Sequence, residues 1–268
     1  MIRLIRLNEE LIDGVLMSEI KILDLIPIIY TEGIKEGLKD REKLAEEIRE
    51  KTAGRVKLEM EFLDMGTASI ESSYDEALNQ PYILKKVKEA EERGYSAVVI
   101  DCFGDPGLNA ARELVKIPVI GANQSACHLA MQIAPTFSII NILPELEPLI
   151  RELALKYGYL DFLASVVTIN IPVLELEKDP DKSAETIANG IETAVKRDRA
   201  HAVVFGCTGM SSLLDLVKQK VANKGIDVPI IEPLRTAVWT AVMFSLMGIS
   251  HSKSAYRPPR EKLRKVPY

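Results

Sequence analysis

Two short segments, one in each half of the chain, share an apolar run that ends in a cysteine. AVVIDCFGDP occupies positions 97–106 and AVVFGCTGMS occupies 202–211, so the alanine, the paired valines and the cysteine keep one constant offset. Two further pairs follow in the same order: ILDLIP (22–27) with IINILP (139–144), and IPVI (117–120) with VPII (228–231). This repeat indicates a duplicated structural unit rather than a short-period solenoid.

Short β-branched runs alternate with longer charged stretches in both halves. KILDLIP at 21–27 is typical of a strand, and the stretch 31–54 that follows has apolar residues at helical spacing. Pro81, within the next charged stretch, is expected to begin a new helix, because proline fits the first turn of a helix better than its interior. Strands separated by helices predict parallel sheets covered on both faces.

The repeat and the alternation together predict an α/β fold: two similar flavodoxin-like parallel-sheet domains related by a pseudo-twofold, with the active site in the cleft between them. The chain is expected to cross to the second unit near Gly121 and to return near Pro233, after which a last helix packs on the first unit. The predicted domains are 17–122 plus 233–268, and 123–232, with 1–16 interpreted as an N-terminal extension or a frayed helix.

Composition narrows the class of protein. A net charge of −5 over 268 residues gives no general basic field for nucleic acid. No apolar run reaches the ~18 residues of a membrane span. We expect no signal peptide, because the N-terminal segment carries acidic residues early and lacks a small-residue cleavage site. Three cysteines without a C-x-x-C pair speak against a disulfide framework, and His128, His201 and His251 lie too far apart for a zinc pattern. We expect a cytoplasmic protein with a small-molecule partner, without metal or cofactor; a homo-oligomer is compatible with the sequence.

The two repeated cysteines are the candidate functional residues. Ligands of open parallel sheets bind beyond the carboxyl ends of the strands, where Cys102 and Cys207 are predicted to lie. A pseudo-twofold would turn both ends toward one cleft, so that the thiols face each other. The glycine-containing turns and helix N-termini that follow favour the thiolate over the thiol, whose ordinary pKa is about 8.5. The negative charge of Asp105 would disfavour the Cys102 thiolate, unless Asp105 caps a helix and points away from the sulfur. Cys127 and His128 are interpreted as structural.

Other cysteine chemistries fit less well. A phosphatase loop needs an arginine where this chain has Leu108 and Leu213. A thiol hydrolase needs a histidine base, and no histidine adjoins either cysteine. CFGDPG and GCTG also lack the glycines and the lysine of a P-loop. A cofactor-independent racemase, in contrast, needs a base on one face of a carbon and an acid on the other, and two opposed cysteines can supply both.

The residues around the cysteines resemble the aspartate/glutamate racemase superfamily, and within it the hydantoin racemase branch. The resemblance runs along most of residues 17–260 and implies that Cys102 and Cys207 are the two catalytic acid/base residues. Its strongest segments are GTASIESSYDEA (66–77), VVIDCFGDPGLNAARELVKIPVIG (98–121), FLASVVTINIPVLEL (162–176) and VVFGCTGM (203–210).

The chain departs from the family pattern in three places. IPIIYT at 26–31 replaces a turn that usually carries asparagines, so this wall becomes apolar. An arginine common in the family is missing at 165–167, and an acidic residue is missing near Asn123. These changes favour a 5-substituted hydantoin with a bulky side chain over a dicarboxylate. The residues predicted to bind substrate are Pro27, Ile28, Gly66, Thr67, Phe103, Gly104, Asn123, Thr208 and Gly209.

The roles of a few other residues are left as alternatives. Thr67 and Ser69 either line the cleft or cap the following helix. Asp101 either accepts a hydrogen bond behind Cys102 or forms a salt bridge at the sheet end. The basic tail at 252–268 either lies along the surface or serves as a lid or subunit contact.

The predicted function is a cofactor-independent racemase of 5-substituted hydantoins or related amino-acid derivatives. The alternatives are a two-cysteine cis–trans isomerase of the maleate type, in which one cysteine adds to the substrate, and a relative that binds a small metabolite without turnover.

Overall fold

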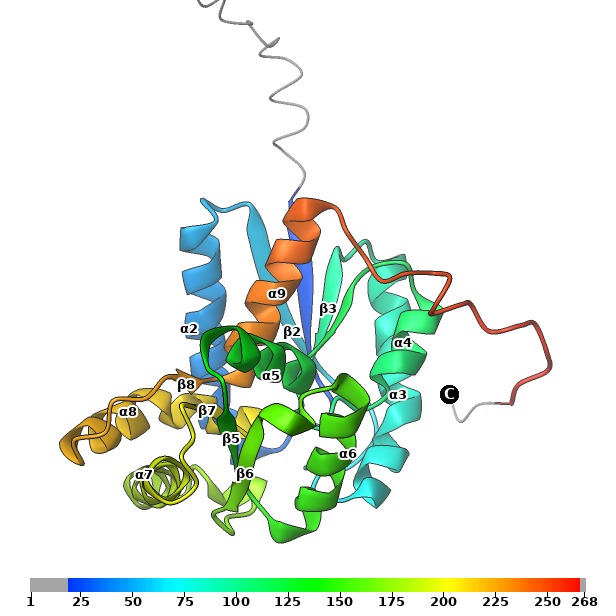
Figure 1. The fold of residues 1–268 in the computed structure, drawn as a ribbon. Helices are drawn as coiled ribbons and strands as arrows, with labels where there is room; N and C mark the ends of the chain where they lie inside the picture. Colours follow the sequence, from blue (N-terminus) through cyan, green and yellow to red (C-terminus); the bar gives the residue numbers. More distant parts are fainter. Residues whose placement is uncertain (1–18, 266–268) are drawn as a thin grey trace, which may run out of the picture.

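The computed structural model describes residues 19–265, which form two four-stranded parallel sheets, one from each half of the chain (Figure 1). The first sheet has the order β2-β1-β3-β4, with β1 (Ile20–Ile26), β2 (Val56–Phe62), β3 (Ala97–Ile100) and β4 (Val119–Gly121). The second has the order β6-β5-β7-β8, with β5 (Phe137–Asn141), β6 (Leu163–Thr168), β7 (Ala202–Phe205) and β8 (Ile230–Ile231). The same order recurs in both sheets, which confirms the predicted pair of similar parallel α/β domains. The extension expected over 1–16 lies outside the described residues.

Helices alternate with these strands along the described chain. They are α2 (Lys35–Lys51), α3 (Ser73–Glu92), α4 (Leu108–Leu114), α5 (Ala122–Ile133), α6 (Glu147–Tyr157), α7 (Pro180–Lys196), α8 (Leu214–Asn223) and α9 (Pro233–Met247). Short 3-10 turns precede or connect several of them: η1 (Glu32–Ile34), η2 (Pro144–Leu146), η3 (Leu160–Phe162), η4 (Val173–Glu175) and η5 (Thr208–Leu213). Within residues 19–265, we find no helix with the length and apolar character that crossing a membrane requires.

Each sheet is buried on both faces, because neighbouring strand residues point to opposite sides. In β1, Ile22 packs with α2 and α9, whereas Leu23 packs with α3 and α4 on the other face. In β7, Val203 packs with α7 and α8, whereas Val204 packs with α5 and α6. This two-sided burial explains why the central strands β3 and β7 are continuous apolar runs rather than alternating patterns.

The last helix returns to the first sheet, as predicted. Helix α9 contacts β1, β3 and β4, and its buried residues share a core with Ile22 and Val99. It also packs along α5, which covers one face of the second sheet. Cys127 of α5 is completely buried in that second core, in agreement with a structural role.

The prediction for Pro81 is wrong. This proline lies inside α3, which continues from Ser73 to Glu92. The helix begins instead at Ser72, whose side chain accepts a hydrogen bond from the Asp75 amide. Proline removes only one backbone hydrogen bond, and the helix continues beyond it because Ile83 and the next apolar turns are buried against the sheet.

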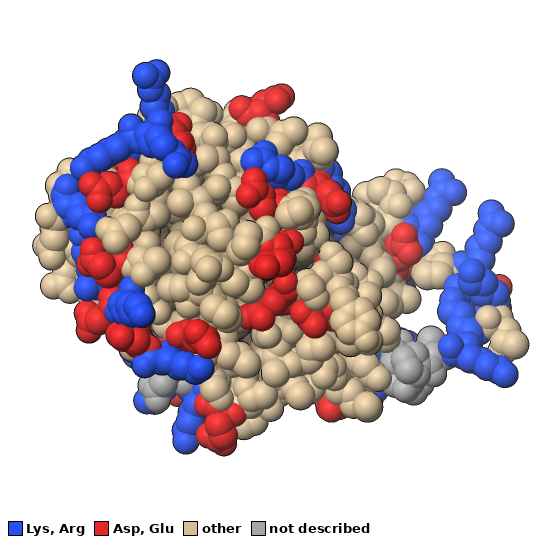
Figure 2. All heavy atoms as spheres, turned by 90° about the horizontal axis from the view of Figure 1, so that it is seen from below, with Lys and Arg blue, Asp and Glu red and all other residues tan. Residues whose placement is uncertain are grey.

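The C-terminal segment packs on the first domain and then leaves it. The His251 ring accepts a hydrogen bond from the Val119 amide at 3.0 Å, and the Arg112 guanidinium lies over the Tyr256 ring. Residues 257–265 are exposed and run out from the body (Figure 1). Figure 2 shows lysine and arginine side chains gathered on a projecting arm of the molecule.

Candidate active site

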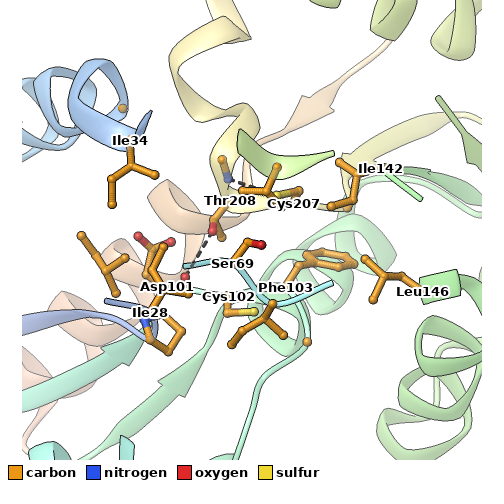
Figure 3. A pocket seen from close by; sticks show the side chains of 18 of the residues that line it. Ile28, Ile34, Ser69, Asp101, Cys102, Phe103, Ile142, Leu146, Cys207 and Thr208 are labelled. Atoms are coloured by element: carbon orange, nitrogen blue, oxygen red, sulfur yellow. Dashed lines mark hydrogen bonds between the residues drawn. The ribbon is translucent and has the colours of Figure 1, made fainter. Parts of the chain in front are cut away.

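A single cleft receives residues from the carboxyl ends of strands in both sheets (Figure 3). Cys102 follows β3 and Cys207 follows β7, and both line this cleft. The predicted residues that line it with them are Pro27, Ile28, Phe103, Gly104, Thr208 and Gly209. The fold therefore brings the two repeated cysteines into one pocket.

The thiol of Cys102 is desolvated. Burial raises its pKa well above the ordinary range, and the nearby Cys207 adds to the effect. The backbone N–H of Gly104 opposes this shift, since it stabilises the charged sulfur. An added Cβ at Gly104 would lie 3.8 Å from Cys102 Sγ, which is an ordinary van der Waals contact, so this glycine borders the sulfur directly.

The surroundings of Cys207 resemble those of Cys102, with a backbone N–H beside a buried sulfur. The N–H of Gly209 donates to Cys207 Sγ at 3.3 Å, a contact that Figure 3 shows as a dashed line. Burial nevertheless raises the pKa of this thiol to about 12, with a smaller contribution from Asp101 and an opposing one from Arg41. The expectation that the turns would favour the thiolate is therefore corrected: the amides are in place, but desolvation outweighs them and raises the pKa of both thiols.

Asp105 points away from Cys102 because it caps another helix. Its two carboxylate oxygens accept hydrogen bonds from the amides of Asn123 and Gln124, each at 3.0 Å, at the start of α5. An added Cβ at Gly121 would lie 2.5 Å from this carboxylate, so the cap requires glycine there. Burial raises the pKa of Asp105 to about 6.

Three of the predicted substrate-binding residues lie outside the cleft lining. Asn123 is completely buried, and its side-chain oxygen accepts a hydrogen bond from the Tyr159 hydroxyl at 3.0 Å. The Thr67 amide donates to the Asn79 side chain at 2.9 Å, and the same side chain leaves no room for a Cβ at Gly66. The Thr67 hydroxyl donates to the Ser69 carbonyl at 2.6 Å, so these residues shape the loop that brings Ser69 into the cleft.

A buried ion pair lies directly behind the cysteines. Both Nε and Nη2 of Arg41 contact Asp101 Oδ2, at 2.7 and 2.6 Å, and Asp101 immediately precedes Cys102. Asp24 lies 3.9 Å from the same guanidinium, and burial together with Asp101 raises the pKa of Asp24. Arg41 also lines the cleft. Arg41 was not predicted from the sequence; the available signal was a lone arginine between Leu38 and Leu44 on the apolar face of a helix.

Three polar contacts cross from the first domain to the second around the cleft. Thr208 Oγ1 donates to the Asp101 carbonyl at 3.2 Å. The Gly37 amide donates to Glu177 at 3.0 Å, and the Val173 amide donates to Glu71 at 2.7 Å. These contacts hold the two walls together, and sequence spacing alone offered no signal for Glu71 or Glu177.

Within residues 19–265, no group of three or more His, Cys, Asp or Glu side chains is arranged to hold a metal ion. His128 belongs to the structure rather than to the cleft, since its Nε2 lies 3.1 Å from the Tyr157 carbonyl oxygen.

Solved structures similar to this one include three racemases. Allantoin racemase from Klebsiella pneumoniae has a TM-score of 0.82 and 29% sequence identity, over 93% of this chain and 97% of that one. Allantoin racemase from Pseudomonas fluorescens has a TM-score of 0.80 and 26% identity, over 92% of this chain and all of that one. Glutamate racemase RacE1 from Bacillus anthracis shares the fold, with a TM-score of 0.56 and 17% identity over 90% of this chain and 91% of that one. The fold is thus that of a class of racemases.

Curated relatives refine this assignment. Hydantoin racemase from Rhizobium meliloti is 42% identical over 196 residues, which is 73% of this chain and 79% of that protein. Hydantoin racemase from Pseudomonas sp. (strain NS671) is 36% identical over 199 residues, 74% of this chain and 78% of that protein. The chain belongs to the Asp/Glu/Hydantoin racemase family, which it matches over residues 41–241, and it is an isomerase of the racemase type.

Proposed function

We propose that this racemase acts on 5-substituted hydantoins without a cofactor, using Cys102 and Cys207 as the acid/base pair. The observation that supports this most strongly is that both cysteines follow equivalent strands and line one cleft. Each is followed two residues later by a glycine whose N–H stabilises the sulfur. The symmetry of the two halves matches the symmetry of a reaction that interconverts mirror images.

In the proposed reaction, the thiolate of one cysteine removes the proton from C5 of the hydantoin. The electron pair of the broken C–H bond moves into the adjacent carbonyl group, which gives a planar enolate. The thiol of the other cysteine then donates its proton to the opposite face of C5, and that sulfur becomes the thiolate. The two cysteines exchange roles when the other enantiomer reacts.

The raised pKa of the thiols bears on this chemistry in two opposing ways. A thiolate formed from a weakly acidic thiol is a stronger base toward a carbon acid. The same shift, to about 12 for Cys207, leaves only a small fraction ionised at neutral pH. We therefore propose that proton loss from one thiol precedes turnover and limits it below the alkaline range.

The choice of substrate rests on the lining of the cleft and on the relatives. Apolar residues such as Ile28, Phe103 and Leu146 line much of the pocket (Figure 3). The curated relatives are hydantoin racemases. A hydantoin ring offers an activated C5–H next to a carbonyl, and an apolar 5-substituent suits this lining better than a charged one.

Incubation with L-5-benzylhydantoin in heavy water tests the proposal, with optical rotation and C5–H exchange as the two readouts. Loss of rotation together with deuterium uptake is expected. No exchange across a panel of 5-substituted hydantoins would refute it. A covalent adduct on one cysteine would instead favour the cis–trans isomerase, and saturable binding without exchange would favour a metabolite-binding protein.

A further inference from the structure

The cleft has two unlike ends, on either side of the cysteines (Figure 3). At one end, Phe103, Ile142 and Leu146 lie together, and at the other lie Ile28 and Ile34. We name the first end the α6 wall, which consists of Phe103, Ile142, Leu146, Leu149, Ile150 and Leu153. We name the second the α2 wall, which consists of Ile28, Ile34, Leu38, Phe62, Arg41 and Glu177.

The α6 wall is apolar throughout. Leu146, Leu149, Ile150 and Leu153 recur at the spacing of one helical face, so that η2 and α6 present a continuous hydrocarbon surface to the cleft. None of its six side chains carries a hydrogen-bonding group. An alkyl or aryl group placed against this wall would leave water without desolvating any charge.

The α6 wall also reaches the reacting sulfur. An added Cβ at Gly104 would lie 3.5 Å from Leu149 Cδ2 and 3.8 Å from Cys102 Sγ. Leu149 Cδ2 and Cys102 Sγ therefore both border the space beside Gly104. A substituent on the carbon that Cys102 deprotonates would lie next to Leu149.

The α2 wall mixes hydrocarbon with charge. Arg41 is paired with Asp101, and Glu177 accepts hydrogen bonds from the Gly37 amide and the Ser212 hydroxyl. An apolar group pressed against these side chains would lower the local polarity around buried charges, which is unfavourable. The polar edge of a substrate ring is better accommodated at this end than an alkyl chain.

We propose that the α6 wall is the subsite for the 5-substituent, and that it makes the enzyme selective for hydantoins with apolar carbon side chains. This inference rests on the proposed function. In the planar enolate the substituent lies in the plane of the ring, and proton delivery to either face moves it only slightly. One subsite beside the cysteines therefore serves both enantiomers, as a racemase requires.

The variant Leu149→Trp tests this assignment, because it fills the subsite without removing a polar contact. The ratio of kcat/KM for 5-benzylhydantoin to kcat/KM for 5-methylhydantoin is expected to fall by about tenfold or more, because the methyl group needs less of the subsite. Retained activity on the methyl substrate also shows that the variant folds. Leu155→Trp is the matched control: it lies on the same helix but is 68% exposed, and it should change neither rate.

Two further variants keep the proposal falsifiable. Leu149→Ala is expected to raise the preference for substituents larger than benzyl, such as indolylmethyl. Ile34→Trp, on the α2 wall, is expected to affect the methyl and benzyl substrates equally. If Ile34→Trp discriminates by substituent size and Leu149→Trp does not, the subsite is wrong while the racemase activity stands. If the wild type exchanges C5–H in no hydantoin, the proposed function fails, and this inference fails with it.

Discussion

Thr208 donates a hydrogen bond from its hydroxyl to the backbone carbonyl of Asp101, 3.2 Å away, across the junction of the two domains (Figure 3). Thr208 follows Cys207, and Asp101 precedes Cys102. The bond therefore ties together the two short segments that carry the thiols. A shift of one domain against the other would change the spacing of the sulfurs and would break this contact.

The variant Thr208→Val removes this hydrogen bond at nearly constant volume. We expect kcat to fall by about tenfold with a smaller change in KM, since the loss of a buried hydrogen bond costs about 1–3 kcal/mol and acts on alignment rather than on contact with the ring. Steady-state kinetics with each enantiomer as the substrate measures kcat and KM. Thr186→Val is the control, because that hydroxyl bonds only within its own helix, and it should leave kcat unchanged.

Replacement of either cleft cysteine tests the two-sided mechanism. Cys102→Ser and Cys207→Ser are each expected to lower racemisation by about 10²–10⁴-fold, because an alcohol is a much weaker acid/base than a thiol. Each variant is still expected to exchange the C5 proton of one enantiomer, namely the one whose C5 proton faces the remaining thiol. Proton NMR in heavy water separates exchange from inversion. Cys127→Ala should retain full activity, since Cys127 is buried in the core of the second domain; if it does not, the assignment of the pair is wrong.

The raised thiol pKa values predict how the rate depends on pH. Burial raises the pKa of Cys207 to about 12 and that of Cys102 above its usual range, so the thiolate is scarce at pH 7 and increases about tenfold per unit below the pKa. We expect kcat/KM, which reports the free enzyme, to rise from pH 7 to pH 9.5 without a plateau. A plateau near pH 8.5 would show that the thiols ionise normally before substrate binds.

Much of the fold could be predicted from the sequence because the relevant information is local. The apolar runs before Cys102 and Cys207 are short enough to be strands, and their repetition placed both thiols at equivalent strand ends. Ligands of parallel sheets bind beyond the carboxyl ends of the strands, and this general rule predicted that both thiols line one cleft. The path of α3 through Pro81 was missed because burial of its apolar face, a tertiary effect, outweighs one lost hydrogen bond.

The remaining features of the site depend on how distant segments meet. The pKa of both thiols is raised by burial between the two domains. The sequence of the turn beside each cysteine does not indicate this burial. Arg41 and Asp101 lie 60 positions apart. A salt bridge was one of the two alternatives for Asp101, but its partner was not named. The signals for that partner were an arginine on an apolar helical face and Asp24 inside an apolar strand. Thr67 was assigned to the cleft because its segment follows the strand that ends in FLDM (62–65), and sequence cannot decide which side chains of that segment point inward.

The buried pair of Arg41 and Asp101 predicts a large effect on stability. Arg41→Met leaves the Asp101 carboxylate buried without its partner, so we expect the free energy of unfolding to fall by about 3–5 kcal/mol, measured by urea denaturation. Arg49→Met, which removes an exposed pair with Glu46 on the same helix, should leave the unfolding midpoint nearly unchanged. The double variant Arg41→Met with Asp101→Leu should recover part of the loss, because the carboxylate that was closest to Arg41 is then removed as well. If the double variant is less stable than Arg41→Met alone, the pair is not the source of the effect.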